Sequence, residues 1–99
     1  MNHSETRRQH VRKDPAVRKA ELLAAALEIA EQDGVLAVTR ASVARKTDTT
    51  VGLMNRYFGG RDELRWATLQ EAGRLKKRAV LDGAIAAGYA KRDIARLTK

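Results

Sequence analysis

Apolar residues recur every three or four positions along most of the chain, the spacing that places them on one face of a helix. The strongest run predicts a helix over residues 15–33 and consists of Leu22, Leu23, Ala26, Leu27, Ile29 and Ala30. Asp14 and Pro15 suit its start, because Asp can cap free amides and proline fits the first helical position. Gly34 suits a left-handed stop after the last turn.

Two short helices are predicted next, joined by a polar turn. Thr39 is placed to cap a helix over residues 40–46, and a further helix covers residues 50–57. Residues 47–50, Thr-Asp-Thr-Thr, interrupt the pattern between them. The glycine pair at 59–60 ends the second helix.

The remaining chain carries three more helical patterns. The fourth helix begins at Asp62-Glu63, whose charges complement its dipole, and continues to about residue 80. Residues 79–87 suit a fifth helix weakened by glycines, and residues 91–97 suit a sixth. Ala and Leu dominate while β-branched residues are scarce, so the composition favours an all-α fold.

The charge pattern indicates a polyanionic partner. The chain has 99 residues, enough for one domain, and a formal net charge of +8. Residues 1–20 contain six basic and two acidic residues. Residues 21–38 contain four acidic residues and no Lys or Arg, whereas residues 39–61 contain five basic residues and one acidic residue. Basic segments therefore bracket an acidic helix, which favours a basic face. Residues 1–14 are interpreted as a flexible basic arm, either a solvated tail or a segment lying along DNA phosphates.

Several classes of function are disfavoured by the composition. Without cysteine, the chain can form neither disulfides nor a zinc finger with Cys ligands, which fits a reducing cytosol. No run approaches the roughly 18 apolar residues of a membrane span, and no secretory leader is evident. No catalytic triad, carboxylate pair, metal cluster or phosphate loop is present. We expect a cytoplasmic protein that is not an enzyme, with no cofactor, metal or membrane partner.

Two short helices joined by a tight turn have the geometry that fits a DNA major groove. Ala44 is small where the helices approach each other, and Val43 and Met54 can fill the core between them. Thr50 can cap the second helix and direct its N-terminus at a phosphate. Gly52 is costly inside a helix, by about 1 kcal/mol relative to Ala, which suggests that backbone and DNA come close there.

Residues 17–70 resemble the N-terminal DNA-binding domain of the TetR (tetracycline-repressor) family. The matching segments are RKAELLAAALEIAEQDG, VTRASVARKT and VGLMNRYFGGRDEL. The resemblance implies a helix-turn-helix bundle of three to four helices over residues 15–80, followed by a short C-terminal helical extension over residues 81–99. It also implies that Phe58 locks the recognition helix against the first helix.

The resemblance further implies which residues contact double-stranded DNA. The residues expected to hold the phosphate backbone are Thr39, Arg40, Thr50, Asn55, Tyr57 and Arg61. Those expected nearest the base edges are Thr49, Val51, Gly52 and Arg56, where Arg56 suits guanine and Val51 a thymine methyl. The chain departs from the family pattern at Asp48, Thr49 and Asn55: Asp tolerates a left-handed turn, Thr49 loosens the packing, and Asn55 replaces a phosphate-binding tyrosine.

We therefore expect a nucleoid-associated bacterial regulator, a plasmid- or phage-borne repressor that controls its own or neighbouring promoters. About 20 residues follow the fourth helix, too few to enclose an effector pocket, so no small-molecule effector is expected. A homodimer on a palindromic operator is expected, with Ala84, Ile85, Ala87, Ile94 and Leu97 as the seam. Alternatives are a nonspecific nucleic-acid-binding protein and a protein-interaction or recombination accessory factor.

Overall fold

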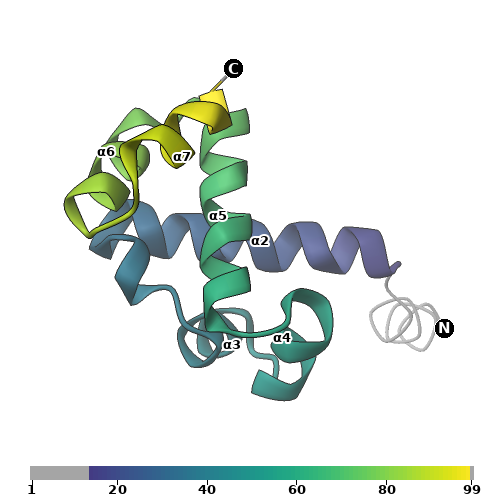
Figure 1. Cartoon of the computed structure of the whole chain (residues 1–99). Helices are drawn as coiled ribbons and strands as arrows, with labels where there is room; N and C mark the ends of the chain where they lie inside the picture. The colour runs from purple at the N-terminus through teal and green to yellow at the C-terminus, as the bar shows by residue number, and fades with distance from the viewer. Residues whose placement is uncertain (1–13, 99) are drawn as a thin grey trace, which may run out of the picture.

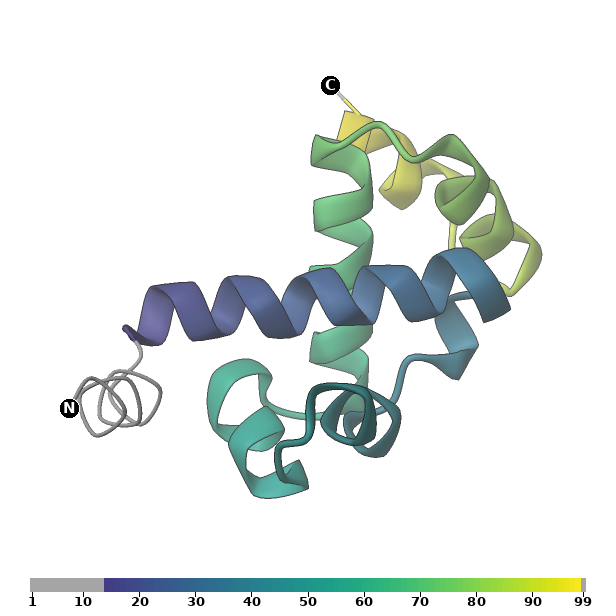
Figure 2. The same ribbon diagram turned by 180° about the vertical axis from the view of Figure 1, so that it is seen from behind.

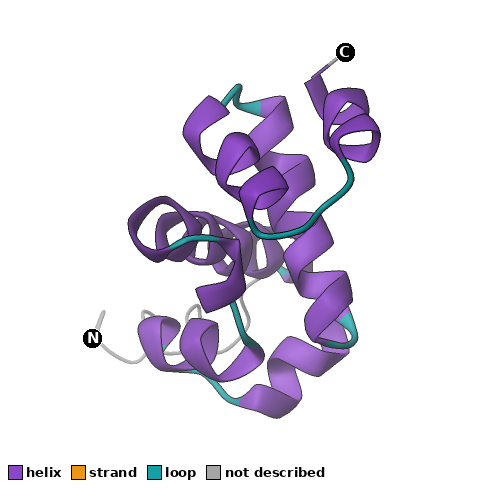
Figure 3. Ribbon diagram, turned by 60° about the vertical axis from the view of Figure 1, so that its left-hand side comes forward, coloured by secondary structure: helices purple, strands orange, loops and turns teal. Residues whose placement is uncertain are grey.

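The computed structural model describes residues 14–98, and every regular element in that range is helical (Figure 3). The elements are α2 (Pro15–Asp33), η1 (Val35–Ala37), α3 (Arg40–Thr47), α4 (Val51–Phe58), α5 (Arg61–Arg74), α6 (Arg78–Ala86), α7 (Lys91–Ala95) and η2 (Arg96–Thr98). The predicted all-α bundle is confirmed. The predicted basic arm lies outside the described residues, except for Asp14.

Helix α5 forms the axis of the molecule, and α2 packs across it (Figure 1). Helices α3 and α4 lie together near the N-terminal end of α5, whereas α6 and α7 lie near its C-terminal end. The view from behind shows the same separation and places the start of α2 on the side of α4 (Figure 2). The helix pair proposed to contact DNA is thus held at one end of the bundle.

Helix α2 begins and ends where its sequence predicts. The Asp14 carboxylate accepts a hydrogen bond from the amide of Ala16 at 2.7 Å, and Pro15 occupies the first helical position. Gly34 follows the last turn with φ 92° and ψ 161°, a positive φ outside the left-handed helical region that was predicted. This backbone turn brings Val35 back onto the core, where it is buried.

The hydrophobic core connects the two short helices to α2 and α5. Its fully buried large side chains include Leu22, Val38, Val43, Met54, Leu64 and Leu69. Truncation of such side chains costs about 2–5 kcal/mol for Leu or Met, so the position of α3 and α4 is fixed by packing. Thr68, also buried, donates its hydroxyl hydrogen to the carbonyl of Leu64 at 2.8 Å, so its polar group is satisfied.

The prediction that the fourth helix reaches residue 80 is wrong, because α5 ends at Arg74. Lys76 adopts φ 56°, and the Lys77 amide donates to the Ala72 carbonyl at 2.8 Å while the Lys76 amide donates to Gly73 at 3.1 Å. This pair of bonds is a Schellman motif, which ends a helix at a left-handed residue. Glycine usually occupies that position, so a lysine gave no signal.

The C-terminal helices form as predicted, but they pack on their own chain. Ala84 and Ile94 are buried, at 0% and 3% exposure, so they cannot form the predicted seam between subunits. Gly73 contacts the backbone carbonyl and Cβ of Leu97, leaving no room for a side chain on α5. Of the other residues of the predicted seam, Ala87 is exposed, and Ile85 and Leu97 are partly buried.

Two apolar side chains of this region are not fully buried. Leu75, which follows the last residue of α5, is 43% exposed. Trp66 is partly buried against the core, and its ring stacks on Tyr89 with 6.4 Å between the ring centroids. At the same end, hydrogen bonds from Arg74 lower the pKa of the Glu71 carboxyl.

Candidate nucleic-acid interface

Helix α3 is held at its start by a reciprocal pair of hydrogen bonds. The Thr39 hydroxyl accepts from the amide of Ser42 at 2.9 Å, and the Ser42 hydroxyl accepts from the amide of Thr39 at 2.9 Å. This capping box satisfies two amides that the helix itself cannot pair. It fixes the position of Arg40, the first residue of α3.

The turn between α3 and α4 depends on one left-handed residue. Asp48 has φ 56° and ψ 44°, the left-handed conformation that Asp was predicted to tolerate in this turn. The Thr49 amide then donates to the Ala44 carbonyl at 2.9 Å, closing the end of α3. The Thr47 and Thr49 hydroxyls lie 2.9 Å apart in a hydrogen bond, which ties Thr49 to the end of α3.

Helix α4 buries one face and exposes the other. The Thr50 hydroxyl accepts from the Leu53 amide at 3.1 Å and caps the helix, while Met54 and Phe58 are buried. Three of the residues predicted to lie nearest the base edges are exposed: Val51, Gly52 and Arg56. Thr49, the fourth of that predicted set, is only partly buried and lies directly before the cap.

The residues predicted to hold phosphates lie on both sides of that exposed face. Arg40 donates from Nη1 to Oδ1 of Asn55 at 3.1 Å, which links the start of α3 to α4. Arg61 begins α5 and is exposed, with its Nε 3.5 Å from a carboxylate oxygen of Asp62. Tyr57 is partly buried and packs against the core, so its ring serves packing as well.

The charges near α4 are unequally neutralised. Lys46 forms an ion pair with Glu28 at 3.2 Å, which ties α3 to α2. Arg56, in contrast, has no hydrogen-bond or ion-pair partner within residues 14–98. An unpaired guanidinium on the exposed face of a capped helix is available for an external acceptor such as a guanine edge.

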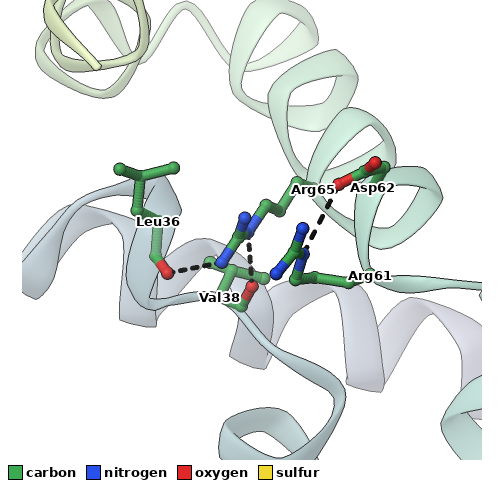
Figure 4. Close-up of polar contacts among 5 residues, drawn as sticks. All are labelled: Leu36, Val38, Arg61, Asp62 and Arg65. Atoms are coloured by element: carbon green, nitrogen blue, oxygen red, sulfur yellow. Dashed lines mark hydrogen bonds and ion pairs between the residues drawn. The ribbon is translucent and has the colours of Figure 1, made fainter. Parts of the chain in front are cut away.

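Two contributions to this site were missed by the sequence analysis. Arg65 on α5 donates from Nε to the Val38 carbonyl at 2.9 Å and from Nη2 to the Leu36 carbonyl at 2.7 Å (Figure 4). Lys19 on α2 lies over the ring of Phe58, 5.5 Å from its centroid. The only signal for Arg65 was its spacing of four residues from Arg61, which places both on one face of a helix.

This geometry accords with the comparisons to known proteins. Residues 22–68 match the family model described as "Bacterial regulatory proteins, tetR family". This segment is similar to the tetR family. It contains most of α2, all of α3 and α4, and the first half of α5.

Curated proteins are similar to the chain over 54 to 68 residues. The HTH-type transcriptional regulator BetI of Paraburkholderia phytofirmans is 37% identical over 54 residues, which is 54% of this chain and 28% of the relative. BetI of Rhizobium meliloti is 38% identical over 68 residues, or 68% of this chain and 33% of the relative. The chain thus matches about a third or less of these relatives' length. No solved structure gave a significant match.

Searches for other kinds of site gave two negative findings. Within residues 14–98, no helix is long and apolar enough to cross a membrane. The same residues contain no group of three or more His, Cys, Asp or Glu side chains placed to hold a metal ion.

Proposed function

We propose that this chain is a sequence-specific, double-stranded DNA-binding transcriptional regulator whose recognition helix is α4. The observation that carries the proposal is the exposed face of α4, where unpaired Arg56 lies on the same short helix as Val51 and Gly52. The match of residues 22–68 to the tetR family supports it independently. The similar curated proteins are HTH-type transcriptional regulators, which supports the regulatory role.

The proposed base contacts come from the first turn of α4, with Val51 and Gly52, and from its last turn, with Arg56. Val51 is 44% exposed, unusual for an apolar side chain, and suits a thymine methyl group. Arg56 supplies a planar pair of donors for O6 and N7 of guanine. Gly52 lets the helix backbone approach the bases, with Thr49 at the edge of the same surface.

The proposed phosphate contacts surround these residues. Thr39, Arg40, Thr50 and Arg61 lie at the caps and first turns of α3, α4 and α5. Asn55 and Tyr57 complete the set from the second half of α4. Helix N-termini carry partial positive charge and unpaired amides, so three of them near one surface favour phosphate binding. Because Asn55 accepts from Arg40 through Oδ1, its amide nitrogen remains able to donate to a phosphate oxygen.

We also propose that two copies bind a palindromic operator and repress transcription by occupying the promoter. One module of this size makes few base contacts, whereas two modules one DNA turn apart, roughly 34 Å, combine theirs. We propose that binding requires no small-molecule effector.

Selection of bound duplexes from a random DNA pool tests the proposal directly. We expect a conserved palindrome, bound without any added small molecule at least about 10³-fold more tightly than a scrambled duplex at physiological salt. A reporter promoter containing that palindrome is then expected to be silenced in cells expressing the chain. Equal affinity for selected and scrambled duplexes would instead indicate a nonspecific nucleic-acid-binding protein.

A further inference from the structure

Arg65 lies at the junction between the two helix starts that carry the proposed phosphate contacts. Val38, whose carbonyl accepts from Arg65 Nε at 2.9 Å, directly precedes Thr39, the cap of α3. Arg65 is itself four residues after Arg61, so both project from the first turns of α5 toward the same segment (Figure 4). One guanidinium therefore joins the start of α5 to the entry of α3.

The connecting segment is held at three consecutive carbonyl groups. Arg65 Nη2 binds the Leu36 carbonyl at 2.7 Å, and the Ser42 hydroxyl lies 2.9 Å from the Ala37 carbonyl. With the bond to Val38, each of these carbonyls is reached by a side chain of α3 or α5. The segment between α2 and α3 contains one short 3-10 turn, η1. Side chains of α3 and α5 therefore supply additional restraints on its backbone.

The charge of Arg65 is used differently from that of its neighbour. Arg61 is exposed and its Nε lies 3.5 Å from Asp62, whereas Arg65 is partly buried and forms no ion pair within residues 14–98. The two hydrogen bonds of Arg65 described above both go to main-chain oxygens. Hydrogen bonds from a charged donor are stronger than neutral ones, so this pair suits a mechanical anchor.

We infer that Arg65 is a positioning residue for DNA recognition, which fixes Thr39 and Arg40 of α3 relative to Arg61 of α5 without touching DNA. Phosphates of a duplex have fixed spacing, so helix starts that hold two of them must keep a fixed separation. Arg65 sets that separation through the Leu36 and Val38 carbonyls. This inference rests on the proposed function.

The test compares Arg65→Lys and Arg65→Met with Arg74→Lys as a matched control. Lysine keeps the charge, but its single nitrogen cannot reproduce the planar fork that reaches two carbonyls. Arg74 lies on the same helix and forms a two-donor contact with Glu71, at 2.9 and 2.8 Å, near the end remote from α3 and α4. The probes are the duplex selected from the random pool and its scrambled version, at a temperature where circular dichroism shows every variant folded.

We expect Arg65→Lys to raise the Kd for the selected duplex about 10-fold and to change the Kd for the scrambled duplex less than 3-fold. Arg74→Lys is expected to leave both values unchanged. An Arg65→Lys protein with wild-type affinity for both duplexes would overturn the inference. So would an Arg65→Met protein that loses affinity for both duplexes equally, with the salt slope reduced by about 0.9, because that pattern marks a direct phosphate contact.

A measurement without DNA separates this inference from the proposed function. In nuclear magnetic resonance spectra of the wild-type chain, we expect the Arg65 Nε–H to exchange slowly with solvent. In Arg65→Lys, the Thr39 and Arg40 amide signals are expected to shift more than in Arg74→Lys. If the wild type fails to discriminate between duplexes, the proposed function fails. If Arg65 Nε–H exchanges as fast as that of Arg56, the anchor itself is refuted.

Discussion

Gly52 stands on the exposed face of α4, where a Cβ atom would meet only the Thr50 hydroxyl oxygen at 3.8 Å, an ordinary contact. The fold therefore has room for a side chain at this position. We predict that Gly52→Ala raises the free energy of unfolding by about 0.5–1 kcal/mol, because alanine is the better helix former. The same change is expected to weaken binding to the selected duplex about 10-fold, because the new methyl group holds the backbone away from the bases.

Gly83 provides the matched control for this prediction. It lies within α6, and a Cβ atom there would meet nothing within 4 Å. Gly83→Ala is expected to raise the free energy of unfolding, measured with urea, by a similar amount and to leave DNA affinity unchanged. If Gly52→Ala binds the selected duplex as tightly as wild type, the proposal that the α4 backbone approaches the bases closely at Gly52 is wrong.

Arg56 offers a test of base recognition itself. Removing a two-donor contact to guanine costs about 1–3 kcal/mol of discrimination, so Arg56→Ala should lose about 5- to 150-fold in affinity for the selected site. Repeating the selection with the variant is expected to give a site relaxed at one position of each half. Arg92→Ala on α7, an exposed arginine remote from α4, is the control. A uniform loss across all sequences would place Arg56 on a phosphate instead.

The sequence was informative for residues whose role depends on local backbone chemistry. Thr39 and Thr50 were identified as caps, and Asp48 as a left-handed residue, because each type has a local conformational preference. Arg65 was missed because its partners, the Val38 and Leu36 carbonyls, are 27 and 29 residues away in sequence. Such contacts depend on how α5 packs on η1, which no local pattern encodes.

At the scale of elements, the starts of the helices were predicted to within about one residue, whereas the end of α5 was not. Both glycine-marked stops, at Gly34 and at the 59–60 pair, were found from sequence. The end of α5 was missed because Lys76, at φ 56°, occupies the position where glycine is usual. The C-terminal helices were predicted, but their burial against α5 required the tertiary contact between Gly73 and Leu97.

The two left-handed residues that end α3 and α5 allow a paired prediction. A left-handed backbone costs an L-residue roughly 1–2 kcal/mol, partly offset by the greater unfolded-state freedom of glycine. We predict that Lys76→Gly stabilises the chain by about 1 kcal/mol and Asp48→Gly by about 0.5 kcal/mol, because Asp tolerates this conformation better. Urea unfolding measures both.

Ala24→Gly, at an exposed site in the middle of α2, is the opposite control and should destabilise by about 1 kcal/mol. Neither Lys76→Gly nor Asp48→Gly is expected to change DNA affinity more than 3-fold, since neither residue belongs to the proposed contact set. A loss of stability in both variants would show that their side chains, rather than backbone strain, dominate at these turns.

At the scale of the whole molecule, the bundle separates the proposed contact surface from the C-terminal helices. Helices α3 and α4 lie at one end of α5, and α6 and α7 at the other (Figure 1). Since Ala84 and Ile94 are buried within the chain, a second copy must use other residues for any contact. Two copies are proposed because one module alone makes few base contacts. The number of copies bound to each duplex is therefore measured on DNA.

The salt dependence of binding gives that number. Each phosphate neutralised by a basic side chain contributes about −0.9 to the slope of log K against log salt concentration. Arg61 is exposed at the start of α5. If it binds a phosphate as proposed, Arg61→Gln removes one such contact from every bound copy. We predict that the slope for the selected palindrome becomes less steep by about 1.8 if two copies bind, and by about 0.9 for a duplex with one half-site. Sedimentation of the complexes provides the independent count, and the same change of about 0.9 on both duplexes would contradict the dimer.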